Sequence, residues 1–240
     1  VAAVVAQNTQ AVRVVSPLTP ELVRAQLEAV FEDVAVAAVK IGMVANAGIA
    51  EAIAEVLARH RPPFVVFDPV MAASTHKRLM NESDLERIRT VLLPQVSLLT
   101  PNLKEAARLL GIAQPVDEAG MRACLPALQA LGVPNVLLKG GHLADDTPDA
   151  PESTDLLATP ESVIRLSAPR IATRHGHGTG CTLSSAIAAL WPQHGLEKAT
   201  RMAKDYVHGA LLHADALQVG HGRGPLHHFW QAVHLPGQLA

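Results

Sequence analysis

The feature that most constrains the fold is a repeated alternation of short apolar runs with longer amphipathic stretches. The apolar runs predict buried strands at 1–6, 35–41, 64–67, 96–99 and 136–138. The stretches between them predict helices at 21–31, 47–60, 84–93, 103–110 and 118–131. Strand then helix, repeated, predicts an α/β fold in which a parallel sheet carries helices on both faces. Aromatic residues make up only 3% of the chain, and the mainly aliphatic remainder suits such a sheet.

The rest of the chain is less regular. The acidic segment 144–160 is rich in proline, serine and threonine, which predicts an exposed loop or hairpin. Short strands are expected at 162–166 and 171–173, helices at 182–191 and 196–217, and a loop at 221–229. No internal repeat or linker divides the chain, so we expect residues 1–240 to form a single domain.

Polar or sulfur-bearing side chains follow the predicted strands where each strand ends. They are Gln7, Met43, Asp68, Asn102 and Lys139. In open α/β sheets the ligand lies beyond the carboxyl ends of the strands. Five strand ends meeting at one rim therefore predict an active site there.

A glycine-rich loop, 176–180, runs directly into the helical pattern that begins at Thr182. Free N–H groups and the positive end of the helix dipole then converge on one point, which predicts an anion site, most simply for phosphate. Cys181 lies in the first turn, where the same field favours the thiolate. The alternative is an ordinary turn with an inert, buried cysteine.

Composition excludes several classes of function. A formal charge of −2 without any block of like charge argues against a nucleic-acid partner, and no apolar run is long enough to cross a membrane. Two cysteines form no disulfide framework, so we expect the reducing cytoplasm. Neither the zinc-site spacings nor the P-loop pattern GxxxxGK[ST] occurs.

Seven segments together resemble the hydroxymethylpyrimidine/phosphomethylpyrimidine kinases of thiamine biosynthesis, members of the ribokinase-like superfamily. They are Ala6-Gln7-Asn8-Thr9-Gln10, Val39-Lys40-Ile41-Gly42-Met43, Asp68-Pro69-Val70-Met71, Leu99-Thr100-Pro101-Asn102-Leu103-Lys104-Glu105-Ala106, Leu138-Lys139-Gly140-Gly141-His142, His177-Gly178-Thr179-Gly180-Cys181-Thr182 and Gly224-Pro225-Leu226-His227-His228-Phe229. The cysteine of Gly-Thr-Gly-Cys is the specific mark, because most sugar kinases of the superfamily carry aspartate there. The resemblance implies a three-layer α/β/α sandwich with a mostly parallel central sheet.

The implied reaction moves the γ-phosphoryl group of ATP to the pyrimidine's hydroxymethyl oxygen, and then a second group to the monophosphate. By this resemblance the backbone N–H groups of Gly178, Thr179 and Gly180 stabilise the transferred phosphate, and Cys181 accepts the proton of the attacking hydroxyl. Lys139 would meet ATP phosphate, unless it merely lines the rim.

The resemblance also implies a magnesium site and a pyrimidine site. Glu105, in the Asn-x-x-Glu element, would help to hold Mg²⁺; Asp68 would assist the metal or hold the turn before Pro69. Gln7 suits a ring nitrogen beside an exocyclic amine, because its amide both donates and accepts. Met43 and Val70 would contact the ring, with a role as core residues as the alternative.

The sequence departs from the family's pattern at its start, which leaves the activity open, and at 74–76 and 191–194, which touch no proposed catalytic group. The family's first strand, glycine-rich loop and helix are expected to precede Gln7 and are absent from this sequence, and 74–76 stands where relatives tend to carry glycine in a flexible segment. A pyridoxal kinase of the thiamine-kinase-like type is one alternative. A truncated, non-catalytic homologue is another, although Lys139, Glu105 and Cys181 argue against it. Relatives commonly form homodimers, and we expect the same here.

Overall fold

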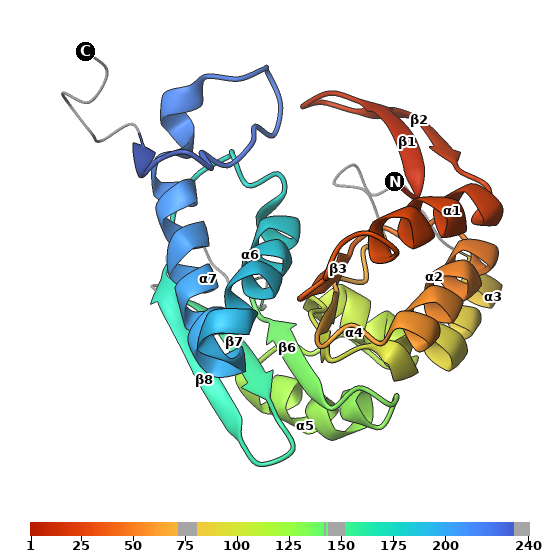
Figure 1. Ribbon diagram of the computed structural model, residues 1–240. Coiled ribbons are helices and arrows are strands. Elements are labelled where there is room, and N and C mark those ends of the chain that lie inside the picture. The colour runs from red at the N-terminus through yellow and green to blue at the C-terminus, as the bar shows by residue number, and fades with distance from the viewer. Residues whose placement is uncertain (72–80, 142, 144–151, 233–240) are drawn as a thin grey trace.

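The centre of the molecule is a six-stranded sheet in the order β3-β4-β5-β6-β7-β8 (Figure 1). The structure is a computed structural model that describes residues 1–71, 81–141, 143 and 152–232. The strands are β3 (Val39–Ile41), β4 (Val65–Phe67), β5 (Leu98–Leu99), β6 (Asn135–Lys139), β7 (Glu152–Ala158) and β8 (Val163–Pro169). Pairing is parallel from β3 to β6 and antiparallel from β6 to β8. The predicted strand–helix alternation is thereby confirmed.

Alternate residues of each strand enter two separate apolar cores. Val65 and Phe67 of β4 pack on one face with the helices that precede β6, whereas Val66 packs on the other face with α6 (Thr179–His194) and α7 (Leu196–Leu212). Because a strand turns successive side chains to opposite faces, a continuous apolar run is what a sheet covered on both faces requires.

The first of these faces is covered by α1 (Pro20–Phe31), α2 (Ala47–His60), α3 (Glu82–Arg87), α4 (Leu103–Leu110) and α5 (Glu118–Gln129). The bounds of α2 and α4 are those that the sequence predicts. The predicted helix 84–93 is divided into α3, a π-helical turn η1 (Ile88–Leu92) and a 3₁₀ turn η2 (Leu93–Gln95). Pro94 has no amide hydrogen with which to continue an α-helix.

The N-terminal strand does not join the central sheet, contrary to the prediction for 1–6. β1 (Ala3–Gln7) pairs antiparallel with β2 (Val12–Pro17) in a separate two-stranded sheet. Asn8 makes the turn, since its side-chain oxygen accepts from the N–H groups of Gln10 and Ala11. A valine-rich partner strand lies so close in sequence that a hairpin forms instead. Val4 and Val14 are exposed, so this hairpin is not a core strand.

For 144–160 the predicted hairpin is confirmed in its second half, where β7 pairs antiparallel with β8, but the predicted exposure is wrong. Residues 155–158 of β7 are buried in the central sheet between β6 and β8, while 144–151 lie outside the described residues. The strand at 162–166 is confirmed as β8, but 171–173 forms none, because β8 has ended at Pro169.

The C-terminal third is helical, as predicted, with altered ends. α6 runs from Thr179 to His194, three residues longer than predicted at each end. Pro192 lies in its last turn and does not terminate it. The 3₁₀ turn η3 (Ala214–Leu217) follows α7, and 221–229 is the expected loop. Segment 74–76 lies outside the described residues. Of the helices in the described ranges, none is long and apolar enough to cross a bilayer.

Candidate active site

A cavity of about 640 Å³ opens at the carboxyl ends of β3 to β6, beside the first turn of α6. The structure brings to its wall every residue that the sequence nominates: Gln7, Met43, Asp68, Val70, Glu105, Lys139, Gly178, Thr179, Gly180 and Cys181. These residues come from segments far apart in the sequence, and the fold brings them together around the cavity.

Four of the five nominated strand ends share one rim, as predicted. The parallel ladder continues past each strand: Asp68 N–H donates to Ile41 O, Thr100 N–H to Phe67 O, and Lys139 N–H to Pro101 O, at 2.9 Å each. Residues that follow neighbouring strands are thus aligned at one edge. Gln7 is the exception. It reaches the cavity from the hairpin, so the prediction that all five come from one sheet is wrong.

Asp68 and Lys139 form the central ion pair. Lys139 Nζ lies 2.7 Å from Asp68 Oδ1, and the Asp68 residue is only 2% exposed. Burial lowers the pKa of Lys139, but the carboxylates of Asp68, Glu105 and Asp155 outweigh it and raise that pKa overall. The lysine therefore keeps its positive charge inside the cavity.

The glycine loop meets this pair at the start of α6. Gly178 has φ +87°, a conformation that favours glycine, and it supplies no side-chain cap to the helix. The first-turn N–H groups remain available to a ligand. An added Cβ at Gly180 would lie 2.9 Å from Lys139 Nζ, so the loop and the ammonium are in direct contact. The geometry is that of an anion site.

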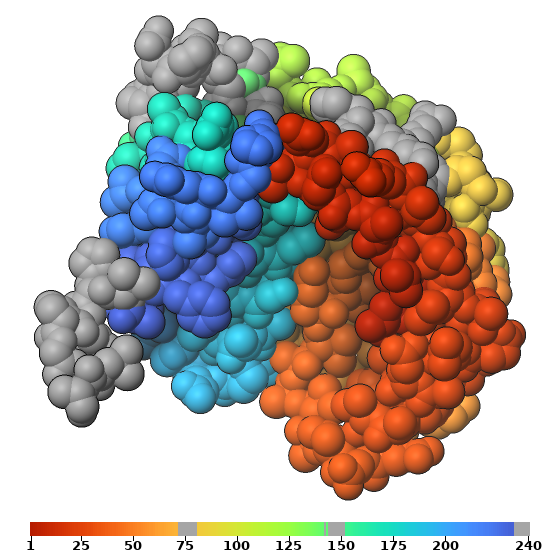
Figure 2. Space-filling view, turned by 90° about the horizontal axis from the view of Figure 1, so that it is seen from above, coloured from red at the N-terminus to blue at the C-terminus, as the bar shows by residue number. Residues whose placement is uncertain are grey.

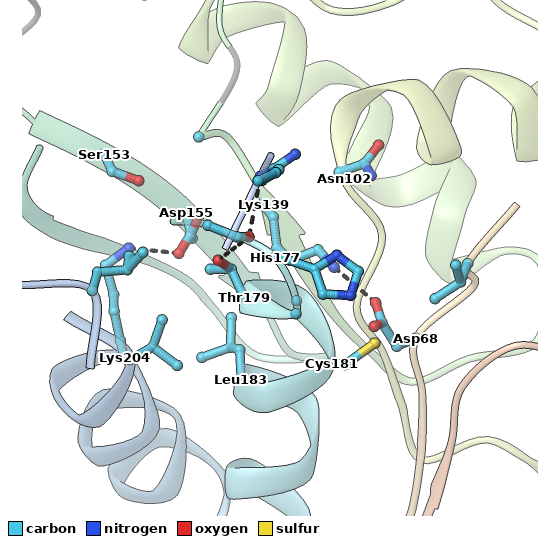
Figure 3. A pocket seen from close by; sticks show the side chains of 18 of the residues that line it. Asp68, Asn102, Lys139, Ser153, Asp155, His177, Thr179, Cys181, Leu183 and Lys204 are labelled. Atoms are coloured by element: carbon cyan, nitrogen blue, oxygen red, sulfur yellow. Dashed lines mark hydrogen bonds and ion pairs between the residues drawn. The ribbon is translucent and has the colours of Figure 1, made fainter. Parts of the chain in front are cut away.

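Cys181 lines the cavity beside Asp68, and its side chain is exposed (Figure 3). Burial and the Asp68 carboxylate raise the pKa of the Cys181 thiol, although the positive charges of Lys40 and Lys139 act in the opposite direction. The expectation of a pKa lowered by the helix start is therefore wrong for the protein without ligands. Burial of the thiol is the largest cause of the raised pKa, and the Asp68 carboxylate adds to it.

Glu105 completes a capping box at the N-terminus of α4. Its carboxylate accepts from Asn102 N–H at 2.8 Å, and its own N–H donates to Asn102 Oδ1 at 3.0 Å. Burial raises its pKa to about 7, with Asp68 adding to the effect and Lys139 opposing it.

The expected Mg²⁺ fits these donors. Among the described residues no group of three His, Cys, Asp or Glu side chains could hold a metal alone. Glu105 and Asp68 interact electrostatically and both line the cavity, so two carboxylates face one space. Mg²⁺ in phosphoryl-transfer enzymes takes one or two carboxylates, water and substrate phosphates, which suits this donor set.

The hairpin closes another side of the cavity with Val5, Gln7, Val12 and Val15. A bulge pairs Gln7 with Val12, so Val12 faces the cavity while Arg13 is exposed to solvent. Its tip is anchored to the segment 220–225, which we name the strap: Arg223 N–H donates to Thr9 O at 2.9 Å. Seen from above, the hairpin crosses toward the C-terminal segments beside a hollow surface (Figure 2).

Several lining residues were not nominated by the sequence. A second buried ion pair joins Lys204 Nζ of α7 to Asp155 Oδ2 of β7 at 2.5 Å (Figure 3). His177 projects into the cavity from the glycine loop, and Arg223 of the strap donates to Gly176 O at 3.1 Å. His177 lies inside a segment that the sequence already singled out. No local pattern marks a pair between a strand and a helix 49 residues later.

Comparisons with known proteins agree with this geometry. The family model described as phosphomethylpyrimidine kinase matches residues 1–227. A hydroxymethylpyrimidine/phosphomethylpyrimidine kinase of Salmonella typhimurium is 48% identical over 95% of this chain and 85% of its own.

Two solved structures are similar throughout. The pyridoxal kinase of Bacillus subtilis, an ADP complex, has a TM-score of 0.85 at 27% identity over 96% of this chain and 85% of its own. The phosphomethylpyrimidine kinase of Clostridium difficile has a TM-score of 0.74 at 33% identity over 88% and 84%. The expected ribokinase-like α/β fold is thereby confirmed.

Proposed function

This chain belongs to the phosphomethylpyrimidine kinase family and is a phosphotransferase, and we propose that its acceptors are 4-amino-5-hydroxymethyl-2-methylpyrimidine and then that pyrimidine's monophosphate. ATP is the phosphoryl donor that the kinase family implies. One observation carries the proposal: the first turn of α6, the Asp68–Lys139 pair and the Cys181 thiol meet at one point of the cavity.

We propose that ATP phosphates bind between Lys139 and the first turn of α6. Phosphoryl transfer depends on positioning and charge neutralisation more than on covalent help from the protein. The N–H groups of Gly178, Thr179 and Gly180 and the buried ammonium supply that neutralisation. The similarity to a kinase structure in complex with ADP supports this assignment.

We propose that Cys181 removes the proton from the hydroxymethyl oxygen. The Asp68 carboxylate lies beside this thiol, so a negatively charged group stands next to the proposed base. Mg²⁺, where bound, supplies positive charge to the phosphates, and Glu105 and Asp68 are the side chains that would hold it.

We propose that the pyrimidine lies between the hairpin and the rim of the sheet. Gln7 would read a ring nitrogen and the exocyclic amine, because its amide both donates and accepts. Met43 and Val70 from the rim, with Val5 and Val12 from the hairpin, supply apolar contact.

A pyridoxal kinase remains the second candidate, because a kinase of that name is among the similar structures. The test is ATP-dependent phosphorylation of the hydroxymethylpyrimidine by this chain, with pyridoxal assayed alongside. Turnover of the pyrimidine is the expected result. Turnover of pyridoxal alone would replace the proposal, and turnover of neither would favour the non-catalytic alternative.

The homodimer, the cytoplasmic location and the absence of nucleic-acid or membrane partners stay predictions. Sedimentation of the purified chain tests the first of them.

A further inference from the structure

Asp155 is the direct cross-strand neighbour of Lys139. The two residues are partners in the antiparallel register of β6 and β7, and such partners carry their side chains on the same face. The Asp155 carboxylate is also close enough to raise the pKa of Lys139. On proximity alone, Asp155 competes with Asp68 for the lysine.

Lys139 nevertheless binds Asp68 at 2.7 Å, and Asp155 is occupied by other donors. Lys204 Nζ lies 2.5 Å from Asp155 Oδ2, and Gly140 N–H donates to Asp155 Oδ1 at 3.0 Å. Asp155 is 5% exposed, so water contributes little to its solvation. Lys204 is therefore the cation that balances its charge.

A buried carboxylate that loses its cation is costly, and it recruits the nearest positive group. For Asp155 that group is Lys139, whose flexible stem starts directly opposite. Moving the ammonium to Asp155 would take it from Asp68, from Gly180 and from the first turn of α6, where the transferred phosphate is proposed to lie.

We propose that Lys204 is a positioning residue: by holding Asp155, it keeps Lys139 at Asp68 and at the anion site. The inference rests on the proposed function only in that Lys139 is taken to bind nucleotide phosphate. It differs from direct binding of ATP by Lys204, because its effect requires the charge of Asp155.

The experiment measures ADP affinity by calorimetry, and KM for ATP against kcat, in a double-mutant cycle of Lys204→Met and Asp155→Asn. Lys204→Met is expected to weaken ADP binding about tenfold or more, the loss of one charge-assisted contact. In the Asp155→Asn background the same change should alter affinity by no more than about twofold. Lys204→Arg, which keeps the cation, should retain ADP affinity.

Equal loss in both backgrounds would overturn the proposal, since Lys204 would then bind nucleotide itself. No loss in either background would overturn it as well. Lys204→Met alone could fail to fold because it leaves the Asp155 carboxylate unpaired. In that case ADP affinity is compared between Asp155→Asn and the double variant, neither of which contains an unpaired carboxylate at position 155. A loss of affinity in the double variant would overturn the proposal.

The matched control is Arg201→Met, which removes an exposed cation one turn earlier on α7, where Arg201 pairs with Glu197. It should leave ADP affinity unchanged. Because calorimetry needs no turnover, a chain that binds ADP but phosphorylates no pyrimidine would contradict the proposed function alone. Normal ADP binding by Lys139→Met would contradict the proposal that Lys139 binds nucleotide phosphate, and this inference would fail with it.

Discussion

Cys181 combines accessibility to a small molecule with a pKa raised by protein burial and by Asp68. A raised pKa leaves less thiolate at neutral pH but makes the thiolate that forms a stronger base. The two acceptors make different demands on such a base. A hydroxymethyl group must lose a proton to attack, whereas a phosphate monoester, with a second pKa of about 6, is already ionised at neutral pH.

Cys181→Ala should therefore lower the first phosphorylation by about a hundredfold or more, the usual contribution of a general base. The second phosphorylation should fall much less. The measurement compares kcat for the pyrimidine and for its monophosphate in the same variant. The control is Cys124→Ala, which removes the second cysteine of the chain, on α5. Equal losses for both acceptors would contradict the assignment of Cys181 as the base.

The raised pKa also predicts how the thiol reacts with iodoacetamide in the protein without ligands. The alkylation rate should keep increasing at pH values where an ordinary thiol, of pKa about 8.5, is already ionised. Mass spectrometry at Cys181 across a pH series measures this. A rate that levels off below pH 8 would mean that Lys40, Lys139 and the helix dipole outweigh Asp68 and burial.

Among the elements, the hairpin is built least like the rest of the chain. Val4 and Val14 face solvent, and the inner valines line the cavity. The tip of the hairpin is held by its hydrogen bonds to the strap. Gly222 N–H donates to Thr9 Oγ1 at 3.2 Å, and an added Cβ at Gly222 would overlap the Thr9 carbonyl oxygen. That oxygen is backbone, so the overlap is relieved only if the hairpin and the strap separate.

Gly222→Ala should therefore raise the KM for the pyrimidine several-fold, since Gln7 and Val12 lose their support. ADP affinity should stay near that of the unaltered protein, because the strap's bonds to the glycine loop come from Arg223 and Gly224 and not from Gly222. Steady-state kinetics with calorimetry on one preparation separates the two effects. His221→Ala, an exposed neighbour, is the control; parallel loss of ADP binding would show that the strap acts on the whole cavity.

The same elements explain which parts of the fold could be predicted. Helices α2 and α4 were predictable to the residue, because an asparagine cap, an amphipathic period and a terminating residue are all local signals. Met43, Asp68, Asn102 and Lys139 were predictable because parallel topology aligns strand ends. β7 was missed because its first residues, Glu-Ser-Thr-Asp, are polar; burial there is decided by β8 and α7.

The hairpin and the second ion pair could not be inferred for a related reason. Whether 1–6 enters the main sheet depends on which strand pairs with it, and apolar pattern carries no information on pairing. Asp155 and Lys204 are ordinary charges in their own segments. Their partnership exists only once β7 and α7 are packed together.

For the molecule as a whole, Glu105 links stability to pH. Its pKa is about 7 when folded and 4.5 when exposed, so the folded state holds a proton that the unfolded state has lost between these values. Stability should therefore fall as pH rises from 4.5 to 7, by about 3 kcal/mol for this group alone. Below 4.5 both states are protonated and the group contributes nothing.

Glu105→Gln removes this proton and preserves an oxygen that can accept from Asn102 N–H. Urea unfolding at pH 4.5 and pH 8 should show that the variant gains stability relative to the unaltered protein at the higher pH only. The same difference at both pH values would mean that Glu105 is ionised in the folded state throughout.

The contact between Thr9 and Gly222 has a consequence for how the protein is made. The two residues are 213 positions apart, so the hairpin is synthesised well before its anchor. Every residue of the sheet rim and the glycine loop can be in position before the strap is synthesised. A nascent chain can thus fold the rim of the sheet while the cavity is still open to water. The covering of the cavity by the hairpin is thus secured only after the rim has been made, and a chain that lacked the strap would retain the rim with an unsecured hairpin.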